Sequence, residues 1–356
     1  MKHTIGCDWH PGHENIAVLD TETGEVIERR LEHENGQARA FYASLPRGAL
    51  VGIEATGYTQ GFQRMLSELG RELWIGDPAA IRASDVRRQK TNRRDAEHLL
   101  DLLLTKKFPR IWVPSADERD LRQLLLHRHK LVGMRTSVRN QLHALAMNQG
   151  LRRRKKLWTG KGRQELEALE LLPWSHRRCQ ELLKLLAELD TSIRALDPAV
   201  EREAQARPEV GELMKQLGVG PVVGLAFALT IGPVRRFANS RKVVSYLGLN
   251  PSEGSTGDRQ RLGAISKQGN SMTRWLLVEA AQTVARLDPE LHRVYYRLKF
   301  RRGASVAKVA VARKLAVKLY WRLRNPAQAV KAAQPARMPG GPSETMVDGN
   351  RSIGLD

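Results

Sequence analysis

The chain has 356 residues, of which 41% are hydrophobic, and it carries a formal net charge of +21. This length allows two or three domains with packed cores, and the apolar content excludes a disordered chain. No apolar run approaches the roughly 20 residues of a membrane-spanning helix. No signal-peptide core follows the first residues. Cys7 and Cys179 exclude a disulfide framework. We therefore expect a cytoplasmic protein with no membrane partner.

The first part of the chain alternates between strand-like and helix-like segments. Helical patterns cover residues 36–45 and 60–69, and a third helix is expected from Pro78, where proline is tolerated. Strand patterns cover residues 3–8, 15–20, 24–32, 49–54 and 72–77. Three strands in succession, followed by strands that alternate with helices, predict a mixed sheet with helices on its faces.

From residue 116 onward the pattern is helical. A long basic helix is expected over residues 117–149, followed by a positively charged loop over 150–163. The next helix carries apolar residues at heptad spacing, which predicts pairing with another helix. An antiparallel hairpin within the chain and a coiled coil between chains are equally compatible with it. Pro198 is expected to kink or end this helix. The seam residues are Leu182, Leu186, Leu189, Ile193, Leu196 and Val200.

Residues 217–232 resemble a helix-hairpin-helix element, with a glycine-rich turn between two apolar helical segments. The amides of such a turn can hold a phosphate, although simple packing of two helices explains the pattern equally well. The tail from residue 326 is rich in Pro, Gly and Ala and is predicted to be disordered. The expected division is a mixed α/β domain over residues 1–115, a helical region over 116–207, a mainly helical domain over 208–325, and the tail.

The positive charge is concentrated in two segments that contain no acidic residue. Residues 121–163 include twelve Lys or Arg, and residues 291–324 include eleven. Such segregation predicts two surfaces for a polyanion, with nucleic-acid binding that weakens as salt rises. Aromatic residues make up only 5% of the chain, which argues against base stacking as the main device of sequence recognition.

Three acidic residues of the first domain could form a metal site. Asp8 ends the first strand, Glu54 ends a later strand, and Asp95 falls on a helix. Carboxylates at the ends of neighbouring strands can converge on a pair of Mg²⁺ ions that stabilise phosphoryl transfer. This is the arrangement of ribonuclease-H-like nucleases, although acids at strand ends are common for other reasons.

A second candidate site lies in the stretch "NPSEGSTGDRQRLGAISKQGNSMTRW" over residues 250–275. Ser255 and Thr256 lie between Gly254 and Gly257, and several positively charged residues follow. A hydroxyl among glycines is typical of an exposed turn. Alternatively, a serine can attack a phosphodiester if its proton is removed.

The order of several short motifs resembles one transposase family. The motifs are "GCDWHPGHENIAVLD", "GIEATGY", "KTNRRDAEHLLDLL" and "FANSRKVVSYLGLNPSEGSTG", followed by "SKQGN". Together they are similar to the DEDD-type transposases of insertion sequences, the IS110 family, whose members are bridge-RNA-guided DNA recombinases. The resemblance implies a first domain like that of the Holliday-junction resolvase RuvC, with four acids that bind two Mg²⁺ ions.

By motif, the resemblance assigns three of these acids to Asp8, Glu54 and Asp95. The fourth position, three residues before Asp95, is Asn92. An amide offers one neutral carbonyl oxygen, so the second Mg²⁺ is expected to be held less tightly. Asp101 is a poor substitute, because six residues along a helix place it on a face about 120° away. A catalytically impaired nucleic-acid-binding relative is therefore an alternative reading.

The resemblance also implies that a serine of the second domain forms a covalent phosphoserine with DNA. Counting back from the "SKQG" motif favours Ser255, whereas counting forward from Pro251 favours Thr256, and Ser252 is more distant. We prefer Ser255, because a primary hydroxyl is less crowded. The alternative enzyme is a metal-dependent nuclease or junction resolvase without a covalent intermediate. His10 and His13 lie near Asp8 and are expected to be exposed.

The implied partners are double-stranded DNA at element ends and target, a structured non-coding guide RNA, and further copies of the chain in a dimer or tetramer. The candidate nucleic-acid-binding residues are all positively charged. They are Arg128, Arg135, Arg139, Arg152, Arg153, Arg154, Lys155, Lys156, Arg259, Arg261, Lys267 and Arg274.

Overall fold

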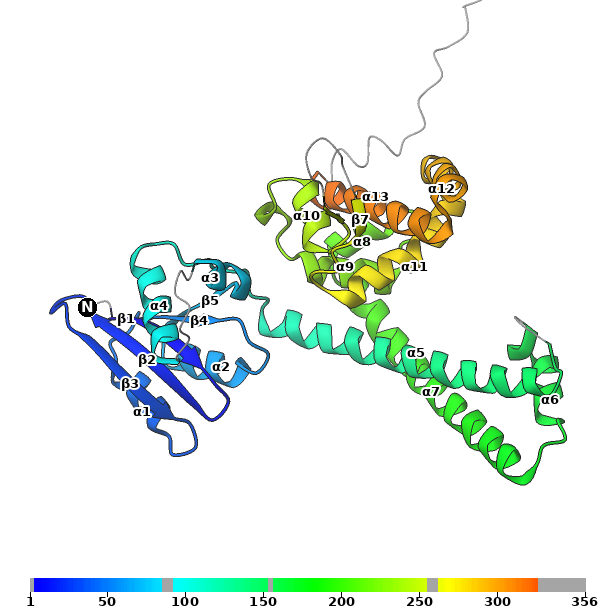
Figure 1. Ribbon diagram of the computed structural model, residues 1–356, viewed down its shortest axis with the longest axis horizontal. Coiled ribbons are helices and arrows are strands. Elements are labelled where there is room, and N and C mark those ends of the chain that lie inside the picture. Colours follow the sequence, from blue (N-terminus) through cyan, green and yellow to red (C-terminus); the bar gives the residue numbers. More distant parts are fainter. Residues whose placement is uncertain (1–2, 85–91, 153–155, 255–261, 326–356) are drawn as a thin grey trace, which may run out of the picture. The chain divides into compact units, whose positions relative to one another are not determined.

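The computed structural model describes residues 3–84, 92–152, 156–254 and 262–325, apart from the side chains of residues 92, 93 and 262. Contacts divide the chain into two compact units, Met1–Pro114 and Ser115–Asp356 (Figure 1). Within this described part, no helix is both long enough and apolar enough to cross a membrane.

The first unit contains a five-stranded mixed sheet in the order β3-β2-β1-β4-β5. β1 is antiparallel to β2 and parallel to β4; β2 and β3 pair antiparallel, and β4 and β5 pair parallel. The predicted mixed sheet is therefore present. The strands are β1 (His3–Trp9), β2 (His13–Asp20), β3 (Val26–Glu32), β4 (Leu50–Glu54) and β5 (Glu72–Gly76).

Helices cover both faces of this sheet (Figure 1). On one face, α1 (Gln37–Ser44) and α2 (Gln60–Glu68) bury Tyr42, Phe62 and Leu66 in the same core as strand residues such as Ile5 and Ile53. On the other face, α3 (Pro78–Ser84) and α4 (Asn92–Leu104) share a small core with Phe108. The alternation of strand side chains between the two faces explains the short apolar runs of the sequence.

Two glycines let α4 and the chain that follows it approach the sheet. A Cβ atom on Gly6 would lie 2.2 Å from the carbonyl oxygen of Ala96, and a Cβ on Gly52 would lie 2.8 Å from a methyl of Leu103. Gly6 and Gly52 are paired neighbours in β1 and β4. The backbone of α4 therefore rests almost directly on the middle of the sheet.

The second unit begins with two long helices, α5 (Ala116–Asn148) and α7 (Pro173–Gln205). Arg128 pairs with Asp197 and Arg135 with Asp190, so residues that rise along α5 meet residues that fall along α7 and the pair is antiparallel. Buried seam residues such as Leu186 and Leu189 pack with Leu142 of α5. The apolar seam of α7 is thus covered within the chain.

Two expectations for this region are corrected. Pro198 was expected to kink or end its helix, and it does not end α7, which remains helical to Gln205. A proline removes one backbone hydrogen-bond donor. α7 nevertheless stays helical here, and Ile193 and Val200, on either side of Pro198, are both buried. The expected loop over residues 150–163 contains a short 3₁₀ helix, η1 (Lys156–Trp158), and the start of α6 (Gly160–Glu167).

The remaining helices form a bundle around a core that includes Phe227, Leu277, Leu315 and Tyr320. Its turn between α8 and α9 contains Gly218, where a Cβ would lie 2.8 Å from a methyl of Val284. Packing against α11 therefore accounts for this glycine of the helix-hairpin-helix-like motif. The elements are α8 (Pro208–Met214), α9 (Pro221–Ile231), η2 (Val234–Arg236), α10 (Ser240–Tyr246), β6 (Pro251–Glu253), β7 (Leu262–Ile265), α11 (Ser271–Leu287), α12 (Pro289–Arg302) and α13 (Ala304–Arg324).

Candidate functional site

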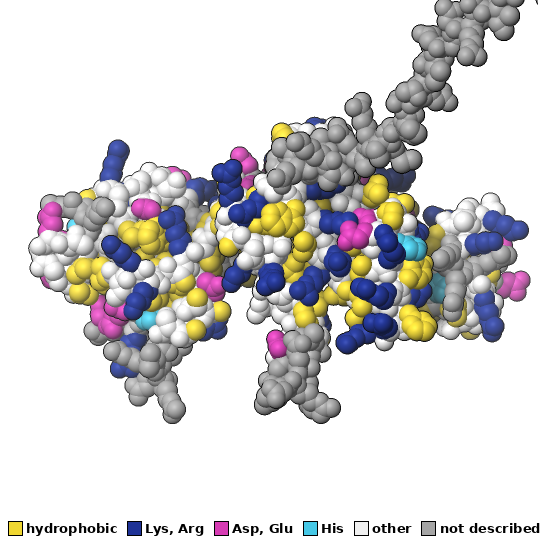
Figure 2. Space-filling view, turned by 90° about the horizontal axis from the view of Figure 1, so that it is seen from above, with side chains coloured by type: hydrophobic (Ala, Val, Ile, Leu, Met, Phe, Trp, Pro, Cys, Tyr) yellow, Lys and Arg dark blue, Asp and Glu magenta, His cyan; other side chains and the backbone are white. Residues whose placement is uncertain are grey.

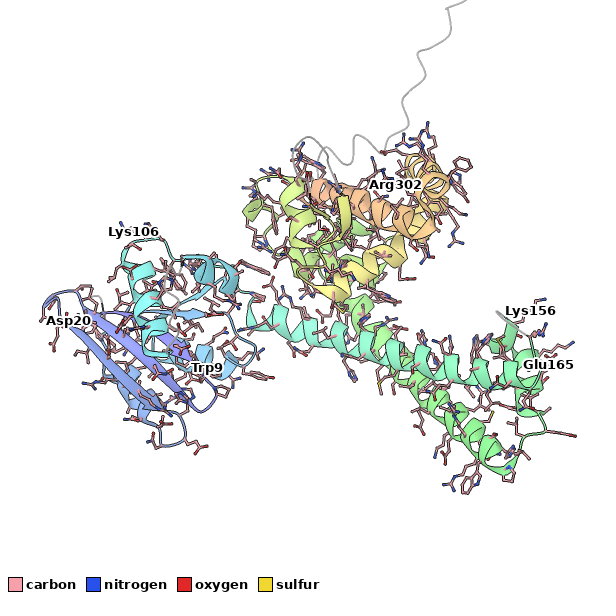
Figure 3. The ribbon with its side chains drawn as sticks, in the orientation of Figure 1. Trp9, Asp20, Lys106, Lys156, Glu165 and Arg302 are labelled. Carbon is pink, nitrogen blue, oxygen red and sulfur yellow. The ribbon has the colours of Figure 1, made fainter. Side chains whose placement is uncertain are left out.

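Asp8 and Glu54 lie at the ends of two neighbouring parallel strands. Cys7 of β1 pairs with Ile53 of β4, so the next residues of the two strands, Asp8 and Glu54, are neighbours. Trp9, labelled in Figure 3, marks this end of β1. The carboxyl ends of parallel strands meet at one edge of a sheet, which is where such folds commonly bind ligands.

Both carboxylates face the side of the sheet that α4 covers. Gly6 and Gly52 approach α4 and the segment after it, and residues two positions apart on a strand point to the same face. Asp8 and Glu54 therefore share the face of α4. Both side chains are half-buried.

Asp95 comes from the first turn of α4, directly before the buried Ala96. Its side chain is half-buried, whereas Asp101 on the same helix is exposed. A negative charge in the first turn is favourable to the helix dipole. The side chain of Asn92, which begins α4, lies outside the described part of the chain.

Carboxylates are suitable ligands for a hard divalent cation. Among the described side chains, however, no three His, Cys, Asp or Glu are gathered closely enough to hold a metal ion. The shared face thus brings together Asp8 and Glu54 under α4, and a complete ligand set of Asp8, Glu54, Asp95 and Asn92 stays a prediction.

His10 is a contact of Asp8 that sequence reasoning missed. Its Nε2 atom lies 3.1 Å from Oδ2 of Asp8, and its ring stacks on His13 with centroids 5.0 Å apart. Both histidines are half-buried rather than exposed as expected. The i, i+2 spacing of Asp8 and His10 would place them on one face of an extended chain, which is the signal that could have revealed the pair.

A buried polar cluster lies on the opposite face of the same strands. Glu14 of β2 is fully buried, with Oε2 3.5 Å from Sγ of Cys7 and 3.5 Å from Nε2 of His33. Burial raises the pKa of Glu14, and the nearby His33 opposes this effect. Burial, followed by the charge of Glu14, raises the pKa of the Cys7 thiol. Ionisation of Glu14 therefore destabilises the fold of this unit.

The candidate nucleophiles Ser255 and Thr256 lie outside the described residues, as do Arg259 and Arg261. The flanks of their segment form an antiparallel hairpin of β6 and β7. Ser252 donates a hydrogen bond from Oγ to the carbonyl oxygen of Ala264, at 2.9 Å across this hairpin. Ser252 therefore has a structural contact, and the choice among Ser255, Thr256 and Ser252 as nucleophile stays a prediction.

The "SKQG" turn beside this hairpin is tightly packed. Lys267 is exposed and adopts a φ of 57°, a left-handed conformation that costs an L-residue about 1 kcal/mol. A Cβ on Gly248 would lie 2.5 Å from the amide nitrogen of Gln268, and one on Gly269 would lie 2.0 Å from the carbonyl oxygen of Tyr246. The turn at Gly248 and the "SKQG" turn are thus in direct backbone contact, and this contact holds Lys267 in its left-handed conformation.

Arg274 fastens the same two turns. Its Nη1 donates to the carbonyl oxygens of Leu247, at 3.1 Å, and Gln268, at 2.6 Å. The guanidinium therefore has a structural role in addition to its predicted role in nucleic-acid binding, which stays a prediction.

The basic residues of α5 are partly neutralised by α7. Arg128 pairs with Asp197 at 2.7 Å, and Asp190 accepts both Arg135, at 3.2 Å, and Arg139, at 3.5 Å. Sequence reasoning could not anticipate these partners, because the acids come from a different, later segment. At the far end of the hairpin, marked by Lys156 in Figure 3, Arg152 and Lys156 are exposed. Arg153, Arg154 and Lys155 are outside the described part.

Comparisons with known families give a consistent result. Residues 5–148 match a DEDD-type transposase family model of the IS110 group, and residues 211–297 match the "Transposase IS116/IS110/IS902 family". These matches include both candidate sites.

Three relatives cover most of the chain. It is 31% identical to a "Probable family 20 transposase" of Pseudomonas aeruginosa, over 90% of this chain and 96% of that protein. It is 28% identical to the transposase for insertion sequence element IS1111A of Coxiella burnetii, over 74% and 73%. It is 25% identical to the transposase for insertion sequence element IS1328 of Yersinia enterocolitica, over 88% and 94%. With a mixed-sheet unit that carries paired strand-end carboxylates and a helical unit that carries the second family match, this chain belongs to the IS110 family of insertion-sequence transposases.

Proposed function

We propose that this transposase cuts and rejoins double-stranded DNA through a phosphoserine intermediate, with Ser255 as nucleophile and Thr256 as the alternative. The observation that supports the acidic half of the site most directly is the shared position of Asp8 and Glu54, at neighbouring strand ends and facing α4. Family membership supports a DNA substrate.

DEDD-type transposases use a divalent metal, and we propose that it is Mg²⁺ here. Its proposed ligands are Asp8, Glu54 and Asp95, with the amide of Asn92. When bound, the metal would supply positive charge that offsets the charge developing on the phosphate oxygens. The contribution of His10 is to orient the Asp8 carboxylate through its contact at 3.1 Å.

Strand transfer at the serine conserves the phosphodiester bond energy. The hydroxyl proton of Ser255 leaves as Oγ bonds to phosphorus, and the departing sugar oxygen takes up a proton. A hydroxyl of another strand then attacks the phosphoserine, which frees the serine and reseals DNA without hydrolysis. Lys267, Arg259 and Arg261 are proposed to hold the phosphate by charge-assisted hydrogen bonds.

Sequence choice is proposed to come from a structured guide RNA that pairs with element ends and target, within a dimer or tetramer of the chain. A protein in such a system reads mainly backbone and shape. The concentration of positive charge in residues 121–163 and 291–324 supports this division of tasks.

The test is a trapping experiment on a denaturing gel with labelled DNA, cognate RNA and Mg²⁺. The parent chain is compared with Ser255→Ala, Thr256→Ala and Asn92→Asp. A protein–DNA adduct lost only in Ser255→Ala supports the proposal. An adduct seen only with Asn92→Asp identifies an impaired metal site. Free DNA ends without any adduct would show a metal-dependent nuclease and overturn the serine mechanism.

A further inference from the structure

α12 exposes to solvent an aromatic side chain that does not contribute to the packing of the fold. Phe300 is 94% exposed and Tyr296, one turn earlier, is 50% exposed. At this exposure the Phe300 ring has an unfavourable contact with water and little compensating packing. Both residues lie near the end of the helix that Arg302 marks in Figure 3.

The two rings lie opposite the face by which α12 packs on the bundle. The inner face consists of the buried Leu291 with the partly buried Val294 and Tyr295. At 100° per residue, Tyr296 and Phe300 fall within an arc of about 40° on the other side of the helix, with Arg293 beside them. The tertiary fold of the described residues therefore leaves this outer face uncovered.

Positive charge surrounds the rings. α12 contains Arg293, Arg297, Lys299, Arg301 and Arg302 but one acid, Glu290. Glu290 is already paired with Lys318 of α13 at 2.8 Å. Lys299 lies 5.5 Å from the centre of the Tyr296 ring, and the His292 ring lies tilted against the same ring with centroids 4.5 Å apart. Among the described residues, neither Arg293 nor Arg297 is paired with a carboxylate.

The face of the helical unit that is seen in Figure 2 shows the same combination of Lys and Arg with apolar side chains. On α12, however, the aromatic rings of Tyr296 and Phe300 are exposed, and positively charged residues lie along both sides of these two rings. We name the outer face of α12 by its members: His292, Arg293, Tyr296, Arg297, Lys299 and Phe300.

We propose that the outer face of α12 binds an unpaired DNA strand, with bases stacked on Phe300 and Tyr296 and phosphates held by the flanking cations. Charge complementarity selects a polyanion. The rings select unpaired nucleotides, because bases within a duplex are stacked on one another, whereas a free base can stack on an aromatic side chain. Membership in a DNA transposase family selects DNA, since strand transfer exposes unpaired segments. This binding does not require the serine chemistry proposed above.

The experiment measures fluorescence anisotropy of the full chain with labelled oligothymidylate, a blunt duplex of equal length, and an abasic strand with the same number of phosphates. The variants are Phe300→Ala and Phe300→Trp. Trp174→Ala is the matched control, because Trp174 is 79% exposed on α7 of the same unit. Phe300 contributes so little packing that its replacement leaves folding intact.

Phe300→Ala is expected to weaken oligothymidylate binding by about 5- to 150-fold, the loss of one base stack. Phe300→Trp should keep the affinity of the parent chain, and Trp174→Ala should also leave the affinity unchanged. The loss should vanish on the abasic strand and on the duplex. An equal loss on all three DNA ligands, or none on oligothymidylate, overturns the proposal. The same variants are also measured with labelled oligouridylate and with anionic vesicles. A loss confined to either of these would identify RNA or a lipid surface as the partner and overturn the proposal. Because no cleavage is measured, failure here is distinct from failure of the serine mechanism.

Discussion

Gly6 of β1 and Ala96 of α4 approach so closely that a Cβ on Gly6 would lie 2.2 Å from the Ala96 carbonyl oxygen. This contact sets the height of α4 above β1, which carries Asp8 next to its last residue, Trp9. Because Asp95 directly precedes Ala96, the same contact governs the position of Asp95 relative to that strand end.

Gly6→Ala is therefore expected to push α4 away from the sheet. Overpacking of this kind destabilises a protein by about 1–3 kcal/mol, and metal-dependent cleavage should fall further than the loss of folded protein explains. Urea unfolding and a cleavage assay on the folded fraction measure the two effects. Gly12→Ala is the control, because a Cβ there meets nothing within 4 Å. Equal activity per folded molecule in both variants would contradict the role of this contact.

The contact between His10 and Asp8 predicts an effect on metal affinity. His10→Ala removes the group that holds Oδ2 of Asp8 at 3.1 Å. Loss of such an outer contact costs about 10- to 100-fold in metal affinity, so cleavage should require more Mg²⁺ but reach a similar rate at saturation. A Mg²⁺ titration of cleavage measures this shift.

The matched control for that experiment is His3→Ala. His3 and Asp20 form a similar pair at 3.8 Å at the other end of the β1–β2 hairpin. An identical change in Mg²⁺ requirement for both variants would attribute the effect to the stability of the hairpin rather than to Asp8.

The sheet was predictable because its signals are local. Strands and helices of the first unit appeared in the periodicity of the sequence. β4 ends at Glu54 as predicted, whereas β1 continues one residue past Asp8 to Trp9. The contact with His10 and the approach of α4 at Gly6 depend on side-chain direction and tertiary distance. The i, i+2 spacing of Asp8 and His10 could have placed the two side chains on one face, but no pattern of residue types encodes their distance or the approach of α4 to the sheet.

The helical pair shows the opposite limit. The seam of α7 predicted a partner helix but could not say whether that helix belonged to the same chain, since both arrangements bury the same leucines. Pro198 illustrates why a local rule fails: the cost of one lost backbone hydrogen bond is small beside the burial of the residues around it. Likewise, the charge of residues 121–163 did not reveal that acids of α7 neutralise Arg135 and Arg139.

That neutralisation makes Asp190 a test of the DNA-binding role of α5. Asp190→Asn frees Arg135 and Arg139, so the helical pair should lose about 1 kcal/mol or less of stability. DNA affinity should nevertheless rise several-fold, with a steeper dependence on salt, because more cations are available for phosphates. Binding of a labelled duplex across a salt series, together with thermal unfolding, measures both effects.

Glu188→Gln provides the control, since it makes the same change in charge at an exposed position of α7. If the two variants bind DNA equally well, net charge alone explains the gain. Arg135 and Arg139 are then structural rather than DNA-binding.

Glu14 predicts a dependence of stability on pH. Its pKa is raised in the folded state by burial, so the unfolded chain loses the Glu14 proton at lower pH than the folded chain does. The stabilising contribution of the protonated form is therefore lost as pH rises from about 4.3, the ordinary glutamate value, through the raised folded pKa. Glu14→Gln has no such loss.

The stability of Glu14→Gln relative to the parent chain should accordingly increase with pH across this window and level off above it. Urea unfolding followed by tryptophan fluorescence measures this difference, and Trp9, which stacks on His33 beside Glu14, is one of the seven tryptophans that contribute. Glu34→Gln, at an exposed position, should show no such trend. A difference that is independent of pH would mean that Glu14 does not change its protonation state in the folded chain over this range.

Lys267 combines strain with a candidate function, so its variants should separate the two. Its φ of 57° is unfavourable for lysine and easy for glycine. Lys267→Gly should therefore be more stable than Lys267→Ala, by up to about 1 kcal/mol after allowance for the greater freedom of unfolded glycine.

Both variants lose the ammonium group. If Lys267 contacts a phosphate, both should lower DNA affinity and reduce the slope of log affinity against log salt by about 0.9. Urea unfolding and salt-dependent binding measure these quantities independently. Equal unfolding midpoints for Lys267→Gly and Lys267→Ala would mean that the turn carries no strain at this position, and unchanged salt slopes would remove Lys267 from the DNA interface.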